Sequence, residues 1–177
     1  MVIKGYKCFN KGLKAYDDMP FVPGVIYECF DDIKFGKNGF HMCLNIEDTL
    51  RYFNGMEEEV DIALVTGYAP FSVYEDEYNG YYDMYACAKL SVDRILTRKE
   101  IMEIVSELPD ARFNRFVSGY RLTPEEYDYF KKKYANNAYV LNNLIYYYED
   151  KTIYEKLNSR ILARVKNDWW IIKYNSP

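Results

Sequence analysis

The only histidine of the 177-residue chain, His41, stands two residues before Cys43, one of its four cysteines. Alternate residues of a strand point to the same face, so a strand here would place both side chains on one side. Cys8 and Cys29 lie on the two strands predicted before it, and consecutive strands are usually neighbours in a sheet. One imidazole and three thiolates can bind zinc tetrahedrally. The spacing lacks the close cysteine pairs of specific zinc motifs, so a histidine and thiols packed at the core is the alternative interpretation.

Two runs of carboxylates are the other residues with chemical potential. They are Glu57, Glu58, Glu59 and Asp61, and then Glu75, Asp76 and Glu77. Paired carboxylates can serve acid–base catalysis, although such runs are usually solvated loop surface. A negative surface also suits a basic partner, such as a nucleic-acid-binding protein, because charge complementarity speeds association and favours specificity. We therefore predict that these residues contact a partner protein.

The elements that position these residues are strands in the first half of the chain. Alternating or apolar runs bounded by turn residues predict strands at Val2–Phe9, Val25–Phe30, Phe40–Leu44, Val60–Tyr68 and Asp83–Val92. One short amphipathic helix is predicted at Ile46–Asn54, with Asn45 as its N-cap and Gly55 after it. Pro70 begins a polar, tyrosine-rich loop.

From Thr97 onward the apolar period becomes helical. Thr97 and Glu100 have the spacing of a capping box, which predicts a helix to about Leu108, before Pro109. Thr123 followed by Pro124 and two acids predicts a second helix start. Further helices are predicted at 138–148 and 153–165, and Trp169–Lys173 is a candidate strand.

The pattern predicts an α+β protein: a small, mostly antiparallel sheet with one short helix, followed by a helical second half. We divide it into a strand-rich acidic region, 1–95, and a helical basic region, 96–177, and favour their packing as one integrated unit over two domains. Residues 1–110 hold 11 Lys and Arg against 20 Asp and Glu, a net charge of −9. Residues 111–177 hold 12 against 7, a net charge of +5.

Several classes of function have no support in the sequence. No run approaches the roughly 20 apolar residues of a membrane helix, and Met1–Asn10 has no apolar stretch typical of a signal peptide, so we expect a soluble cytoplasmic protein. The motifs G-x-S-x-G and G-x-x-x-x-G-K-[ST] are absent. The sequence pI of about 5.2 argues against direct nucleic-acid binding, despite the run Lys131–Lys133. No motif in the sequence identifies a catalysed reaction.

Three segments carry a resemblance to a known family. They are Lys4–Lys11 (KGYKCFNK), Val22–Glu28 (VPGVIYE) and Lys37–Cys43 (KNGFHMC), of which the G-F-H-x-C core is the most specific. This pattern resembles a family of small uncharacterised phage and prophage proteins, over about residues 4–65. Members often carry further cysteines where this chain has Lys14-Ala15 and Phe35-Gly36. The resemblance implies an origin in a mobile element and, accordingly, the cytoplasm of a bacterial host.

We therefore predict a non-enzymatic phage or mobile-element protein that binds a host protein and inhibits a bacterial defence complex of the CRISPR type. One alternative is a small zinc-stabilised binding module. Another is an ADP-ribosyltransferase-like enzyme using NAD, because the order of strands and short helix looks like the NAD-binding half of that fold. Against that enzyme, the first strand offers Lys4 and Tyr6 in place of the usual His or Arg, and Glu75 and Glu77 fall in a predicted loop.

Overall fold

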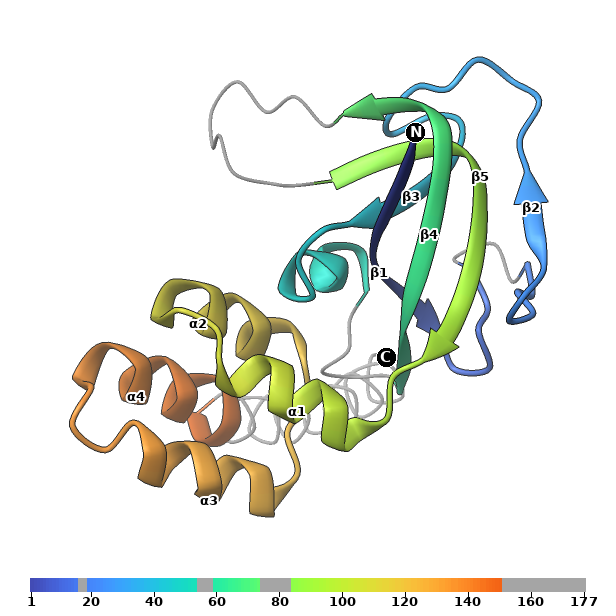
Figure 1. Ribbon diagram of the computed structural model, residues 1–177. Helices are drawn as coiled ribbons and strands as arrows, with labels where there is room; N and C mark the ends of the chain where they lie inside the picture. The colour runs from blue at the N-terminus through green and yellow to red at the C-terminus, as the bar shows by residue number, and fades with distance from the viewer. Residues whose placement is uncertain (16–18, 54–58, 74–83, 151–177) are drawn as a thin grey trace, which may run out of the picture. The chain divides into compact units, whose positions relative to one another are not determined.

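The computed structural model describes residues 1–15, 19–53, 59–73 and 84–150 of the chain, with the strands first and helices after them (Figure 1). The elements of the first half are β1 (Val2–Asn10), β2 (Ile26–Glu28), β3 (Phe40–Cys43), the 3-10 helix η1 (Glu47–Tyr52), β4 (Val60–Val73) and β5 (Met84–Ile95). The helices are α1 (Arg98–Ser106), α2 (Asp110–Gly119), α3 (Pro124–Lys133), α4 (Ala138–Ile145) and the π-helical turn η2 (Tyr146–Asp150). An antiparallel sheet followed by helices confirms the predicted α+β class.

The antiparallel ladders of the sheet join into a closed circuit. β4 pairs with β1 along one edge, from Val2 opposite Tyr68 to Asn10 opposite Val60, and with β5 along the other edge. β3 connects β5 back to β1. β2 pairs with β5 beyond the end of β3 and so stands at one end of the strand order β2-β5-β3-β1-β4 (Figure 1). Closure of this kind leaves few strand edges exposed to other chains.

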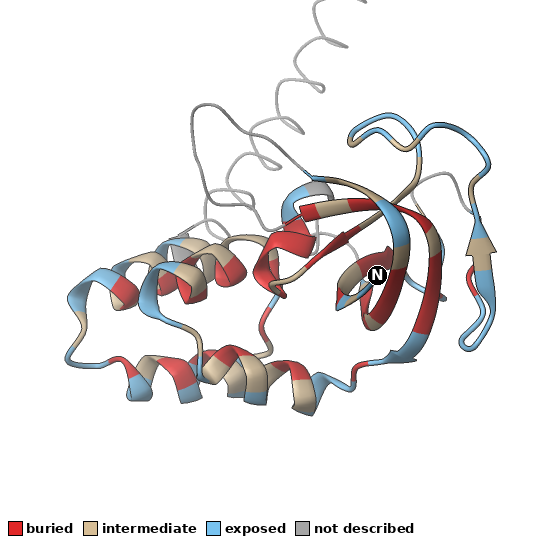
Figure 2. Ribbon diagram, turned by 45° about the horizontal axis from the view of Figure 1, so that its top comes forward, coloured by how far each residue is buried: buried red, intermediate tan, exposed pale blue. Residues whose placement is uncertain are grey.

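Met42 of β3 sets the packing between the strands of this circuit. A Cβ at Gly67 would lie 2.5 Å from the Met42 sulfur, and a Cβ at Gly5 would lie 2.8 Å from its Cε. The two glycines therefore leave the space that the Met42 side chain occupies. The other buried members of this core cluster are Phe9, Leu13, Phe21, Ala63, Val65, Cys87, Leu90 and Val92. Figure 2 shows the buried stretches of the strands and, by contrast, the exposed strand β2 at the rim of the sheet.

β4 is longer than the sequence predicts. The predicted strand ends at Tyr68, whereas β4 continues past Pro70 to Val73. Its register with β5 shifts between Tyr68 and Phe71. Pro70 thus lies at an irregularity of the ladder, which is a position where sheets tolerate proline.

The short helix after β3 is a 3-10 helix and not the predicted α-helix. Asn45 does not cap it: the Asn45 amide donates to Asp48 Oδ2 at 3.1 Å, and Ile46 stands at the N-cap without a capping side chain. The acids of its first turn, Glu47 and Asp48, are buried. A buried carboxylate needs partners, and these two find theirs on α2 rather than on their own backbone.

The predicted capping box at Thr97 is present, and the helix start predicted at Thr123 is a capping box as well. The Thr97 side chain accepts from the Glu100 N–H, and the Glu100 carboxylate accepts from the Thr97 N–H. Thr123 and Glu126 make the same reciprocal pair at the start of α3. Each pair satisfies two backbone donors that a helix start otherwise leaves unpaired. No helix within the ranges given above is long and apolar enough to cross a membrane.

α2 is not among the helices that the sequence predicts. Pro109 is predicted only as the end of the preceding helix, whereas it also occupies the N-cap of α2, without a side-chain capping bond. Phe113, Phe116 and Val117 of α2 are buried. Their spacing of three and four residues is the apolar helical pattern that could have revealed the element.

The chain forms two compact units, residues 1–121 and residues 122–177. The predicted division at residue 95, where strands give way to helices, falls within the first unit, so α1 and α2 belong with the strands. In the second unit Phe130, Val140 and Leu144 are buried, and the rings of Tyr127 and Tyr148 stack with centroids 4.1 Å apart. The predicted helix 153–165 and the candidate strand at 169–173 lie outside the described residues.

Candidate functional site

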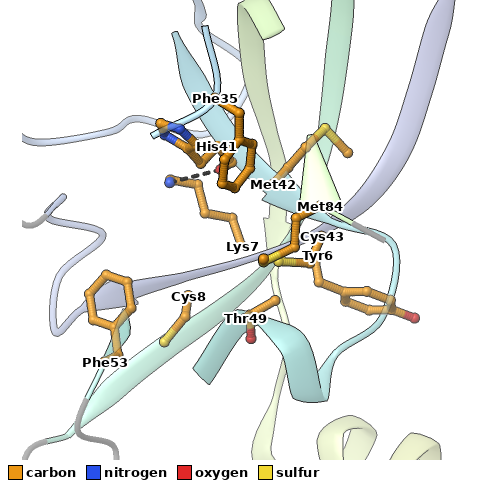
Figure 3. A pocket seen from close by; sticks show the side chains of 10 residues that line it. All are labelled: Tyr6, Lys7, Cys8, Phe35, His41, Met42, Cys43, Thr49, Phe53 and Met84. Atoms are coloured by element: carbon orange, nitrogen blue, oxygen red, sulfur yellow. Dashed lines mark hydrogen bonds between the residues drawn. The ribbon is translucent and has the colours of Figure 1, made fainter. Parts of the chain in front are cut away.

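Three of the predicted site residues, Cys8, His41 and Cys43, line one hollow (Figure 3). Its ten lining residues come from β1, β3, η1, the start of β5 and neighbouring segments: Tyr6, Lys7, Cys8, Phe35, His41, Met42, Cys43, Thr49, Phe53 and Met84. The hollow has a volume of about 320 Å³, counted with its open mouth. The hollow thus has Cys8, His41 and Cys43 in one lining, and the chemistry of these groups decides what it can do.

The thiols of the sheet are poor nucleophiles. Burial raises the pKa of Cys8 and that of Cys43 to about 12, and the pKa of Cys87 to about 11. The thiolate is the form that attacks electrophiles and binds metals. These three side chains therefore stay protonated at neutral pH and pack as small apolar groups.

His41 serves the local structure. Its Nε2 accepts a hydrogen bond from the Gly36 N–H at 2.9 Å, and its ring lies edge-on to the Phe35 ring at 4.7 Å between centroids. Burial, and then the charge of Lys7, lower the pKa of His41 below its usual value. Lys7 Nζ itself donates to the main-chain oxygen of His41 at 2.9 Å (Figure 3). The imidazole is therefore neutral and already uses its acceptor nitrogen.

The structure does not gather the four predicted zinc ligands. Cys29 follows β2, and its N–H donates to the Ala88 oxygen of β5. The prediction assumed that consecutive strands are neighbours, but β2 and β3 do not pair with each other: they pair with successive stretches of one edge of β5, Lys89–Ser91 and Met84–Cys87. Cys29 therefore lies opposite Ala88 and Cys43 opposite Met84, four residues apart along β5. Among the described residues no group of three or more His, Cys, Asp or Glu side chains is arranged to hold a metal ion.

Only two residues of the predicted acidic partner surface, Glu59 and Asp61, lie in the described part of the chain. Glu57, Glu58, Glu75, Asp76 and Glu77 lie outside the described residues. Glu59 is exposed, and its carboxylate lies 3.8 Å from Lys11 Nζ, as expected for a solvated surface group.

Asp61 does not belong to that surface, contrary to the prediction. It points inward from β4 with only 8% of its area exposed. Its carboxylate accepts from the N–H of Gly12 at 2.7 Å, from the N–H of Leu13 at 3.2 Å and from Lys11 Nζ at 3.2 Å. Asp61 therefore holds the turn after β1, and both of its oxygens already accept hydrogen bonds within the chain.

Two ion pairs that sequence reasoning missed join η1 to α2. The Arg112 guanidinium donates to both oxygens of Glu47, and Arg115 Nη1 donates to Asp48 Oδ1 at 2.9 Å. Both acidic side chains are 0% exposed, while the two arginines are 33% and 39% exposed. The signal in the sequence was the spacing of three residues between the arginines, which places them on one helix face. These pairs anchor α2 to the strand-containing unit.

The carboxyl group of Asp48 is buried where η1 contacts α2. Desolvation raises the pKa of its carboxyl group, even though Asn45 and Arg115 act in the opposite direction. A buried carboxylate with fixed partners is a structural element in this setting, because its oxygens already accept from Asn45 and Arg115. Neither acid of η1 is therefore a candidate for acid–base chemistry.

A second candidate site is the segment around β2, residues 22–32, called the edge segment below. Its large apolar side chains are exposed to water: Val22 (54%), Val25 (43%), Ile26 (57%) and Phe30 (89%). The same segment contains the acids Glu28, Asp31 and Asp32 and no Lys or Arg. Contiguous exposed apolar groups rimmed by charge are typical of interaction sites.

Comparison with known proteins places the chain in one family. Residues 3–104 match the family described as a domain of unknown function (DUF7666), which is more than half of the chain, so the protein belongs to that family. No curated protein and no solved structure matches this chain. The match covers β1 to most of α1, and therefore both the hollow and the edge segment. It ends before Arg112 and Arg115, whose acidic partners on η1 lie within it.

Proposed function

We propose that this chain is a non-enzymatic binding protein of a phage or another mobile element, and that it binds a protein of the bacterial host. The observation that carries the proposal is the edge segment, in which four apolar side chains are exposed beside three acids. Burying such groups against a partner is favourable because it removes apolar area from water. The hollow adds support, since its thiols are protonated and its imidazole is hydrogen-bonded within the chain.

The target class we propose is a nucleic-acid-binding defence complex of the CRISPR type, which the chain inhibits by occupying a basic surface. Such complexes hold nucleic acid in positively charged channels. The first 110 residues of this chain carry a net charge of −9. Opposite charges accelerate encounter and select orientation, and they do so most strongly at low salt.

The test is binding of the full chain to a purified effector complex of this type from the same host. We expect a stable complex whose association rate falls as salt increases, and a loss of target cleavage without covalent change to the effector. Variants that neutralise Glu57–Glu59 or Glu75–Glu77 with glutamine and asparagine should associate more slowly. Retention of no host protein by the immobilised chain at low salt would refute the proposal.

The NAD-dependent alternative has no observation in its favour and stays a prediction. Two of its candidate acids, Glu75 and Glu77, lie outside the described residues. Incubation of the chain with labelled NAD and host lysate checks it directly. Transfer or hydrolysis of NAD by the chain would replace the binding function with an enzymatic one.

A further inference from the structure

β2 has one edge bonded to β5 and one edge open. The Cys29 N–H donates to the Ala88 oxygen at 2.8 Å, which continues the register between β2 and β5. In an antiparallel ladder, hydrogen-bonded pairs alternate with pairs whose main-chain groups point the other way. Tyr27 therefore bonds to β5, and the N–H and C=O groups of Ile26 and Glu28 point away from it. Among the described residues no strand pairs with that side of β2 (Figure 1).

The side chains of β2 fix the strand on the sheet through Tyr27 and leave one apolar and one acidic side chain on its outer face. The Tyr27 ring lies 4.5 Å from the Phe21 ring and packs against the core cluster. Side chains alternate along a strand, so Ile26 and Glu28 point outward. Phe30 follows with 89% of its area exposed. Tyr27 therefore holds β2 against the core cluster, while Ile26 and Phe30 are exposed beside the open edge.

The charge beside this edge is negative. Glu28 pairs with Lys89 at 2.8 Å. Asp31 and Asp32 are exposed, and neither forms an ion pair within the described part of the chain. Lys89, which lies opposite Glu28 in the ladder, is thus already paired with an acid. The carboxylates of Asp31 and Asp32, at the end of the edge segment, are not paired with a base in the described part of the chain. A partner with lysine or arginine would supply the missing charge.

We propose that the open edge of β2 takes up an extended segment of the partner protein as an added strand, and that this segment carries lysine or arginine among apolar residues. This inference deepens the proposed function and rests on it. The main-chain groups of Ile26 and Glu28 bond to the added strand, as in other cases of strand addition to a sheet edge. Apolar side chains of the segment cover Ile26 and Phe30, and its basic side chains pair with the two aspartates.

A second copy of this chain fits the edge less well than a basic segment. Pairing of two β2 strands would bring the acids of one copy against those of the other, because each edge segment holds three acids and no base. Like charges across a ladder are destabilising. The charge therefore selects a partner of opposite sign over self-association.

The experiment uses the full chain labelled for NMR and three capped eight-residue peptides. In the first, valine alternates with lysine; in the second, valine alternates with glutamate; in the third, proline alternates with lysine. The third keeps the charge of the first but lacks every second N–H, the donors that the apolar positions of the first supply to the ladder. We expect the valine–lysine peptide alone to bind and to slow hydrogen exchange at the amides of Ile26 and Glu28. Equal binding of the glutamate or proline peptide, or unchanged exchange at both amides, would overturn the inference.

The matched variant is Ile26→Pro, which removes one outward N–H and leaves the bonds of Tyr27 and Cys29 to β5. We expect it to weaken binding of the valine–lysine peptide by about fivefold, as loss of one hydrogen bond should. Its control, Ile26→Thr, keeps the N–H and should bind more tightly than the proline variant. If Ile26→Pro fails to fold, the double variant Asp31→Asn/Asp32→Asn decides the matter. An unchanged affinity in that variant would overturn the predicted charge pairing.

Failure of this inference can be told apart from failure of the proposed function. If the wild-type chain binds the host effector and Ile26→Pro binds it equally well, the function stands and strand addition at β2 is wrong. If the wild-type chain binds no host protein, the function is wrong whatever the peptides do. A dimer of the chain that Ile26→Pro abolishes would show that the occupant is a second copy, which would also overturn the inference.

Discussion

The wall of the hollow and the edge segment use their side chains in opposite ways. In the wall, the groups able to do chemistry are occupied: burial keeps Cys8 and Cys43 protonated, and His41 accepts a bond from Gly36. In the edge segment, Ile26 and Phe30 have no chemistry and are left in water. The reactive groups of the wall are therefore occupied within the chain, whereas the apolar groups of the edge segment are left exposed for contact.

The largest expected effect is the loss of stability when a side chain packed between the strands is shortened. Met42→Ala should lower the free energy of unfolding by about 3 kcal/mol, because the cavity it leaves is lined by strands that cannot collapse fully. The measurement is guanidinium unfolding of the full chain followed by circular dichroism. Met19→Ala, at a methionine that is 37% exposed, is the matched control and should change stability by at most about 0.5 kcal/mol. Equal losses in the two variants would contradict the packing role of Met42.

Thiol reactivity should separate the two regions almost as strongly. In the native chain at pH 8 we expect iodoacetamide to modify Cys29, which is partly exposed beside β2, about 100-fold faster than Cys8 or Cys43. The reason is that thiolate is scarce when burial raises the thiol pKa to about 12. Peptide mass spectrometry over time gives the rates, and Cys29→Ser should retain only the slow ones. Fast modification of Cys8 in the folded chain would show that the wall is accessible.

Two acids from one predicted acidic run should behave differently. Asp61→Asn should lower the free energy of unfolding by about 2 kcal/mol, because the amide keeps one oxygen for the N–H groups of Gly12 and Leu13 but loses the negative charge and the oxygen that accepts from Lys11. Glu59→Gln should change it by no more than about 0.5 kcal/mol, since its pair with Lys11 is solvated. Chemical unfolding of both variants checks this contrast. If Asp61→Asn leaves the free energy of unfolding unchanged, Asp61 becomes a candidate contact residue again.

The pH dependence of stability should carry a smaller contribution from His41. Its pKa is lowered in the folded chain, so the unfolded chain binds the proton more readily. Stability should therefore fall as pH decreases through the unfolded pKa of about 6.5 and continue to fall toward the lower folded pKa. His41→Gln removes this contribution and should show a flatter profile over that window. Parallel profiles for the wild type and the variant would contradict it.

The smallest effect on stability should come from the edge segment. Phe30→Ser should change the free energy of unfolding by at most about 0.5 kcal/mol, because Phe30 is 89% exposed. The same variant should weaken binding of the valine–lysine peptide, whose apolar side chains lose a contact. Thermal unfolding and a peptide titration give the two numbers. If Phe30→Ser lowers the stability of the chain but binds the peptide as tightly as the wild type, Phe30 is a packing residue and not a contact residue.

Local signals in the sequence were enough for much of the fold. The strands around Gly5 and His41 and the strand beginning at Val60 follow from alternation and turn residues, and the capping box at Thr97 and the helix start at Thr123 are where the pattern predicts them. Such features depend on residues within a few positions of one another. The α+β class follows from the change of period that these elements create.

What the sequence by itself determined, then, is the class of the fold and which short segments become strands or capped helices. Only the tertiary structure decided that β2 and β3 pair with separate stretches of one edge of β5, which places Cys29 opposite Ala88 and Cys43 opposite Met84, and that no metal-holding group forms among the described residues. It also decided that Asp61 turns inward and that β2 keeps an open edge. The physical reason is that strand order, burial and hydrogen-bond partners are set by contacts between residues far apart in the chain, which local spacing does not encode.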